Sequence, residues 1–215
     1  SCDVYFYELA LKIGIDRISK MARRFGLGAR YDIPMSAVAK GLVADPAWKE
    51  RAHGRDWLIG DTVNASIGQG YMLASPLQLA IMTARLATGR SVTPRLIRSI
   101  DGVVQPDGAG EPMDLNENNL RRMRRAMFAV SNERRGTAYS SRIIEDSLRL
   151  AGKTGTAQVR SISMAERNSG VLSEADLAWE QRDHALFVSF APTDAPKIAV
   201  SVVVEHGGGG SKAAA

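Results

Sequence analysis

Cysteine is almost missing from this 215-residue chain, which contains only Cys2. A single cysteine cannot form a disulfide within the chain, so the sequence gives no sign of its redox compartment. Aromatic residues are also scarce, at 6%. No apolar run approaches the roughly 18 residues of a membrane-spanning helix, so we expect no part of these residues to cross a bilayer. Zinc-finger spacings, RNA-binding signatures and a signal peptide are not found either.

The residues that are present describe a globular chain. Hydrophobic residues make up 45% and charged residues 24% of it, and the length is enough for one large domain. The net charge is +5, and part of the excess gathers at Arg121, Arg122, Arg124 and Arg125. Such a cluster fits either a polyanion-binding surface or a solvated helix face. We favour the solvated face and expect no nucleic-acid partner, because no nucleic-acid motif accompanies the arginines.

Periodicity and punctuation predict an α+β order of elements. Helices are expected at residues 3–12, 16–25, 76–88 and 116–130, and strands at 92–100, 149–159, 185–191 and 197–205. Residues 31–61 read as a long loop, residues 64–70 as a tight turn, and residues 160–181 as polar and irregular. The last three strands are expected to form an antiparallel meander. The glycine run at 207–210 is interpreted as a natural loop leading into a helix, in preference to an engineered linker.

The stretch with the most chemistry is the strand predicted around Lys153. Lys153 is a point cation that can attract a carboxylate, and Thr154 and Thr156 carry hydroxyls that can bond to the same anion. Gly155 has no side chain, so a substrate backbone can approach the strand closely. The N–H of Thr156 can point at a developing oxyanion. The plain alternative is a strand with an exposed lysine and a glycine bulge.

Two motifs support the chemical interpretation. Lys153-Thr154-Gly155 is the third of the three motifs of penicillin-binding acyl-serine enzymes, which are Ser-x-x-Lys, Ser-x-Asn and Lys-Thr-Gly. Ser1-Cys2-Asp3 is similar to the second, with Asp3 in place of asparagine. The chain resembles the elongation-type, class B penicillin-binding proteins along nearly all its length, at residues 1–10, 14–18, 66–71, 74–80, 151–159, 183–192 and 203–210.

This resemblance implies a fold and an activity. The fold is the penicillin-binding, serine β-lactamase-like transpeptidase fold, an α+β domain with a helical subdomain and an antiparallel sheet. Residues 1–147 would be its mostly helical part and residues 148–215 its sheet part, truncated at both ends. The activity is D,D-transpeptidation of peptidoglycan stem peptides during cell elongation, through an acyl-serine that β-lactams also form. The implied partners are stem peptides, β-lactams and the membrane glycan polymerase of the elongation machinery. The implied place is the periplasmic face of the inner membrane, on a membrane-anchored parent protein.

The resemblance also implies roles for particular residues. Ser1 would relay a proton between Lys153 and the leaving amine, and Asp3 would hold the hydrogen-bond network of the site. Lys153, Thr154 and Thr156 would hold the substrate carboxylate, and the Thr156 N–H would form half of the oxyanion hole. Further support for the cleft is expected from the loop that contains Gln69 and Gly70.

Ser-x-x-Lys, the motif of the nucleophile, does not occur in these residues. Ser36 and Lys40 are one residue too far apart. Because Ser1 is not a methionine and directly precedes an amphipathic stretch, where it would stand at an N-cap position, we expect the chain to start inside a larger protein and the isolated piece to be inactive. No other cofactor is expected, but Cys2 is either a small buried residue or a zinc ligand whose partners lie outside the chain. His184 is interpreted as a satisfied histidine at the base of its strand.

Three other functions stay open at this point. A serine β-lactamase or D,D-carboxypeptidase shares Lys-Thr-Gly, although the aromatic stretch 1–7 and the loop 68–70 argue against both. A penicillin-binding fold that has lost its chemistry would serve as a sensor or scaffold. A basic interaction domain would bind any polyanion in a strongly salt-dependent way.

Overall fold

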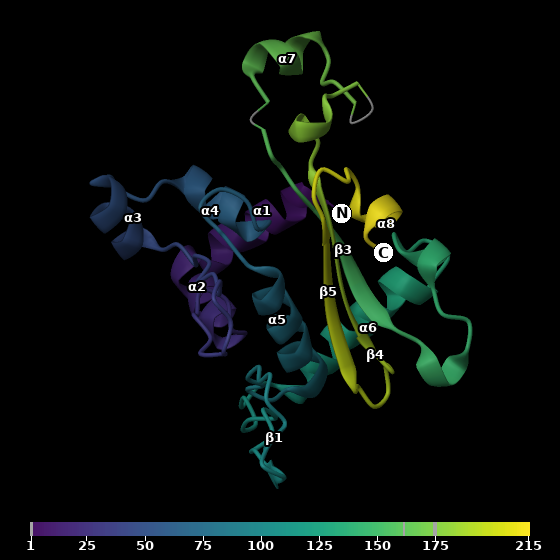
Figure 1. Cartoon of the computed structure of the whole chain (residues 1–215). Helices are drawn as coiled ribbons and strands as arrows, with labels where there is room; N and C mark the ends of the chain where they lie inside the picture. The colour runs from purple at the N-terminus through teal and green to yellow at the C-terminus, as the bar shows by residue number, and fades with distance from the viewer. Residues whose placement is uncertain (1, 161, 174–175) are drawn as a thin grey trace. The chain divides into compact units, whose positions relative to one another are not determined.

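The computed structural model describes residues 2–160, 162–173 and 176–215, and it divides them into two compact units. The first unit contains the residues up to 85 together with 89–115, and the second contains 86–88 and 116–215. The helices are α1 (Asp3–Ile13), α2 (Ile15–Arg24), α3 (Pro46–His53), α4 (Ile59–Ser66), α5 (Pro76–Thr88), α6 (Glu117–Asn132), α7 (Met164–Ser169) and α8 (Gly210–Ala213) (Figure 1). The strands are β1 (Ser99–Ile100), β2 (Val103–Val104), β3 (Ala151–Ala157), β4 (His184–Ala191) and β5 (Ile198–Val204). Short 3-10 helices are η1 (Tyr139–Ser141), η2 (Asp146–Leu148) and η3 (Trp179–Gln181).

Helices α1 and α2 follow the predicted ranges, but the predicted loop at 31–61 is wrong. It contains α3 and the start of α4. Asp45 caps α3, since its Oδ1 accepts a bond from the Trp48 N–H at 2.8 Å, and Pro46 occupies the first helical position. Helix α3 ends at Gly54 in the left-handed region, with φ 59°. This Asp-Pro start and glycine stop are legible in the sequence.

A buried ion pair joins α3 to α4. The Lys49 Nζ lies 2.6 Å from the Asp61 Oδ2, and Lys49 is only 4% exposed. The same carboxylate accepts a bond from the Leu58 N–H at 2.7 Å, at the start of α4. Desolvation alone would raise the pKa of Asp61, but the ammonium and this N–H more than offset it and hold that pKa below its usual value.

Helix α5 begins and ends as predicted. Ser75 and Gln78 form a reciprocal capping box, and Gly89 ends the helix with φ 70°. Gln78 is fully buried, and its Nε2 donates to Ala29 O at 2.8 Å and Lys40 O at 2.6 Å. One side chain therefore holds the helix start and two loop segments of the first unit together.

The predicted strand at 92–100 is wrong. Only Ser99–Ile100 pairs, in a two-stranded hairpin with Val103–Val104. Pro94 has no N–H to donate to a ladder. The segment instead bonds back to a later loop, through the Thr93 N–H to Gly108 O at 2.8 Å and the Ser91 N–H to Glu111 O at 2.8 Å.

The second unit is built on an antiparallel sheet in the order β3-β4-β5, which confirms the predicted meander. Two apolar clusters hold it, one of Ala87, Met127, Ala151 and Phe190, the other of Ala138, Ala185, Phe187 and Ala214. Helix α6 packs against β3, and the short α8 packs against β4 and β3 (Figure 1). A helical turn near Ser211 is therefore confirmed. The predicted division of the domain into a helical part up to residue 147 and a sheet part from residue 148 stays a prediction. Helix α6 belongs to the second unit, together with the sheet.

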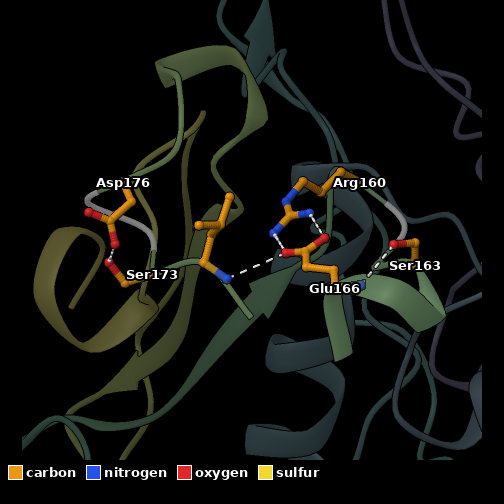
Figure 2. A network of polar contacts seen from close by, with 6 residues as sticks. Arg160, Ser163, Glu166, Ser173 and Asp176 are labelled. Carbon is orange, nitrogen blue, oxygen red and sulfur yellow. Dashed lines mark hydrogen bonds and ion pairs between the residues drawn. The ribbon is translucent and has the colours of Figure 1, made fainter. Parts of the chain in front are cut away.

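The excursion between β3 and β4 has more order than predicted. Ser163 caps α7, since its Oγ accepts a bond from the Glu166 N–H at 3.2 Å. Two guanidinium nitrogens of Arg160 donate to the two Glu166 carboxylate oxygens at 2.7 and 2.6 Å, as Figure 2 shows. The Arg160 hydrogen bonds hold the pKa of Glu166 below its usual value, against a smaller opposing effect of desolvation. Ser173 donates to Asp176 further along the same excursion.

None of the helices in the described part of the chain has the length and apolarity needed to traverse a bilayer.

Candidate active site

Lys153 lies on β3, the edge strand of the three-stranded sheet, opposite Val188 of β4. Its Nζ donates to the carbonyl oxygen of Thr154 at 2.5 Å. The residue is exposed as a whole, but partial desolvation of the ammonium lowers its pKa from the ordinary lysine value. A lysine with a lowered pKa gives up its proton more easily than an ordinary lysine, while its charged form attracts an anion.

Thr154 is held by a residue whose role the sequence does not reveal. Its Oγ1 lies 2.8 Å from the Oγ1 of Thr137, and either hydroxyl can donate. Thr137 belongs to the loop that follows α6, where the Ala138 N–H donates to Val130 O at 3.0 Å. Gly136 is required there, because a Cβ would lie 2.2 Å from the Val130 carbonyl oxygen. From the sequence alone, Gly136-Thr137-Ala138 indicates no more than a loop.

The two glycines of β3 meet different surroundings. A Cβ on Gly152 would lie 2.4 Å from the Phe187 ring, so packing within the protein demands glycine there. A Cβ on Gly155 would meet only Leu186 Cβ, at an ordinary 3.4 Å. Nothing among the described residues therefore requires glycine at 155. This fits the expectation that the space beside Gly155 serves a molecule outside the chain.

Thr156 is exposed and lies opposite Ala185, two residues from Thr154. Because side chains alternate along a strand, the Thr154 and Thr156 hydroxyls lie on the same face of β3. Two hydroxyls and a lysine ammonium thus occur within four consecutive residues of one edge strand. By the same alternation Lys153 leaves β3 on the opposite face, and its Nζ reaches back to the Thr154 carbonyl. The two hydroxyls can hold a carboxylate, and the strand edge can pair with an extended peptide.

The other predicted residues belong to the first unit. Ser1 lies outside the described residues. Asp3 is exposed in the first turn of α1, where a carboxylate favours the helix dipole. Gln69 and Gly70 follow α4, which packs against α1. The turn predicted at 64–70 is confirmed only after α4 ends at Ser66, where Gly70 has φ 69° and the Gln69 N–H donates to Asn64 O at 3.0 Å.

Cys2 is exposed, so the interpretation of a small buried residue is wrong. It stands before α1 in an extended backbone conformation, at the N-cap position expected for Ser1. Across residues 2–160, 162–173 and 176–215 no three His, Cys, Asp or Glu side chains gather into a group that could hold a metal. The zinc expectation stays a prediction, and no chemical step is drawn through it.

The Lys-Thr-Gly-Thr sequence lies on the edge strand of an antiparallel sheet against which α6 and α8 pack, an arrangement typical of penicillin-binding acyl-serine enzymes. The model of the penicillin binding protein transpeptidase domain matches residues 1–215, and the chain belongs to this family. It has the penicillin-binding transpeptidase fold, as the resemblance predicted.

Particular relatives are proteins of the penicillin-binding protein 2 type. The chain is 39% identical to the peptidoglycan D,D-transpeptidase MrdA of Acinetobacter baumannii, over 100% of this chain and 32% of that protein. Penicillin-binding protein 2 of Pseudomonas aeruginosa, solved with WCK 5153, matches with a TM-score of 0.81 and 40% identity, over 99% of this chain and 44% of that one. The Helicobacter pylori protein in complex with MreC gives a TM-score of 0.81 and 38% identity, over 98% and 36%. The chain thus spans about one third of the curated relatives it matches.

Proposed function

We propose that the protein carrying this chain is a peptidoglycan D,D-transpeptidase of cell elongation that penicillins acylate. The observation that carries the proposal is the edge of β3. Lys153 has a lowered pKa there, Thr154 and Thr156 share a face, and Gly155 leaves its outer space open. The name of a relative at 39% identity, a peptidoglycan D,D-transpeptidase, supports the activity.

In the proposed reaction, a serine of a Ser-x-x-Lys motif elsewhere in the protein attacks the penultimate D-alanine carbonyl of a stem peptide. The serine–carbonyl ester forms, the C–N bond to the terminal D-alanine breaks, and a proton passes to the leaving amine. Ser1 relays that proton, with Lys153 as its partner and Asp3 holding the network. An amine of a second stem peptide then attacks the ester, which forms the cross-link and releases the serine.

The residues of β3 bind the substrate and polarise its reacting carbonyl group. Lys153 and the hydroxyls of Thr154 and Thr156 hold the terminal carboxylate, and Thr137 orients the Thr154 hydroxyl. The Thr156 N–H supplies half of the oxyanion hole. The loop at Gln69 and Gly70 supports the cleft. A β-lactam enters as a mimic of the D-alanyl-D-alanine end, with its carboxylate on the same groups.

The setting of this reaction is part of the proposal. The protein acts at the periplasmic face of the inner membrane, together with the membrane glycan polymerase of the elongation machinery. The Helicobacter pylori complex, in which penicillin-binding protein 2 is paired with MreC, supports a place in such an assembly.

The test uses the full-length protein and a fluorescent penicillin. Wild type should give a covalent band on a denaturing gel, and Lys153→Ala should slow its formation at least about a hundredfold, the usual contribution of an acid–base group. Lys197→Ala, at an exposed lysine before β5, is the matched control and should label normally. A folded wild type that gives no band would move the assignment to a sensor or scaffold. Equal labelling of Lys153→Ala would remove Lys153 from the chemistry. Release of D-alanine without a cross-linked product would indicate a carboxypeptidase.

A further inference from the structure

Two histidines and a tryptophan gather where β4 begins and β5 ends. His184 is the first residue of β4, and His206 follows β5 by two residues. Their ring centroids are 4.7 Å apart with planes at 65°. Trp179 of η3 also contacts the His206 ring, with centroids 4.5 Å apart and planes at 58°. The expectation of a satisfied histidine at 184 is met by the His206 backbone N–H, which donates to the His184 ring.

The hydrogen bonds of this pair decide where the protons lie. The His206 backbone N–H lies 3.0 Å from the His184 Nδ1, and a backbone amide can only donate. His184 therefore carries no proton on Nδ1, and its proton is on Nε2. The His206 Nδ1 lies 3.0 Å from the Arg182 carbonyl oxygen, which can only accept, so the His206 Nδ1 carries a proton. The His184 ring thus accepts a hydrogen bond through Nδ1, and the His206 ring donates one through Nδ1.

The two hydrogen bonds stabilise an unusual backbone conformation at His206. Its φ is 54°, in the left-handed region that residues other than glycine rarely adopt and that surrounding contacts must stabilise. His206 also directly precedes the run of four glycines that leads into α8. The Gly208 N–H donates to Asp183 O at 2.8 Å, immediately before His184. The start of β4 therefore anchors the run at two places.

The far end of the run touches the Lys-Thr-Gly strand. A Cβ on Gly210 would lie 2.3 Å from Gly155 O, 2.4 Å from Leu186 O and 3.0 Å from Gly155 N. The backbone of the run thus lies directly against the backbone of Gly155, with no side chain between them to absorb a displacement. Gly155 precedes Thr156, whose N–H serves the oxyanion hole in the proposed function.

We propose that His184 and His206 are positioning residues for acyl transfer. They hold residues 207–210 behind Gly155, which keeps the Thr156 N–H in place, and they do so only while His184 is neutral. A protonated His184 has N–H groups on both ring nitrogens, so its Nδ1–H would oppose the His206 N–H and their bond would be lost. This inference rests on the proposed function, and it makes acylation sensitive to acid at a site behind the strand.

Charged groups surround the pair on the neighbouring elements. The Asp183 Oδ1 accepts a bond from the Val159 N–H at 3.2 Å, and the Arg182 Nε donates to Leu177 O at 3.2 Å. The charged residues on the elements around the two rings are Glu180, Arg182, Asp183, Glu205 and Lys212. The test must therefore change His184 without changing any of them.

The experiment measures fluorescent-penicillin acylation rates of the full-length protein between about pH 8 and about pH 5, where histidine changes its charge. In His184→Asn, the amide oxygen lies near the position of the His184 Nδ1, and this acceptor does not titrate. His184→Ala removes the acceptor. His184→Ala should be slower than wild type by roughly tenfold at the upper end of this range, the size of one lost hydrogen bond, with faster amide exchange at residues 206–210. The two rates should converge toward the acid end, where wild type loses the same bond. His184→Asn should keep the wild-type rate at the upper end and lose less of it in acid. The exposed His53→Ala is the matched control and should follow wild type.

Two results would overturn the inference: a wild-type acylation rate in His184→Ala at the upper end of the pH range, or an acid decline in His184→Asn as steep as in wild type. If His184→Ala does not fold, the pH profile of His184→Asn decides alone. If wild type itself is not acylated, the proposed function fails, and amide exchange at 206–210 still tests the pair. Equal exchange in wild type and His184→Ala would then refute the positioning role.

Discussion

Gly210→Ala should loosen the contact between α8 and the Lys-Thr-Gly strand. The new Cβ would lie 2.3 Å from Gly155 O and 2.4 Å from Leu186 O, both backbone atoms of paired strands. These separations must open by roughly 1 Å before the contact is tolerable. Side chains could turn away at small cost, but strand carbonyl groups move only together with their sheet.

The magnitude follows from two opposing effects. Overpacking costs about 1 to 3 kcal/mol, and the rigid neighbours place this site at the upper end. Alanine is better than glycine in a helix by about 1 kcal/mol, which offsets part of that cost. We expect a net loss of about 2 kcal/mol in the free energy of unfolding. At about 2–4 °C per kcal/mol for a domain of this size, the Tm should fall by roughly 4 to 8 °C.

The neighbouring glycine supplies a matched control. Gly209 has φ −83°, which any residue adopts, and a Cβ there would meet nothing within 4 Å. Gly209→Ala should therefore cost no more than about 0.5 kcal/mol, from its N-cap position. Thermal unfolding of the full-length protein, followed by circular dichroism, compares the two variants, and Gly210→Ala should also be acylated more slowly. The same Tm for both would refute the close contact of α8 with β3.

Two further predictions concern the first unit. Gln78→Leu should lower the free energy of unfolding by about 3 kcal/mol, because the carbonyl groups of Ala29 and Lys40 lose their buried donor, and denaturant titration measures this. Asp61→Asn should cost about 2–3 kcal/mol, because it leaves the Lys49 ammonium buried without its counterion. Since the pKa of Asp61 is lowered in the fold, its contribution is complete above the ordinary aspartate pKa and is lost as the pH falls through the lowered value. Asp61→Asn should accordingly show a weaker acid dependence of unfolding than wild type.

Controls for these variants are available on the surface. Gln181→Leu and Asp56→Asn change exposed side chains of the same types and should each stay within about 0.5 kcal/mol of wild type. Unfolding of Gln78→Leu at the midpoint of Gln181→Leu would contradict the bonding role of Gln78. Equal acid sensitivity of Asp61→Asn and wild type would contradict the ion pair.

The errors made from the sequence have local causes. The loop predicted at 31–61 overlooked Asp45-Pro46 and Gly54, which are ordinary helix signals around a short helix. The strand predicted at 92–100 contains Pro94, which cannot donate to a ladder, and only its last two residues pair. The excursion after β3 was expected to be irregular, but the Arg160–Glu166 ion pair and the Ser163 cap order a helix of six residues there.

The sequence by itself determined the features that depend on residues close together in the chain. The start and end of α5 follow from Ser75, Pro76 and Gly89, and the Lys153-Thr154-Gly155 strand and the family followed from short motifs in a fixed order. The capping bonds of α5 form between residues only a few positions apart, so local pattern is sufficient to predict them.

Only the tertiary structure decided which distant residues support the strand. The contact of Thr137 with Thr154, the approach of Gly210 to Gly155 and the bond between His206 and His184 join residues 17, 55 and 22 positions apart. Each depends on the register of β3, β4 and β5 and on where α6 and α8 pack. A one-residue shift in register would turn every side chain of a strand to the opposite face, so these contacts are fixed only once the strands have paired.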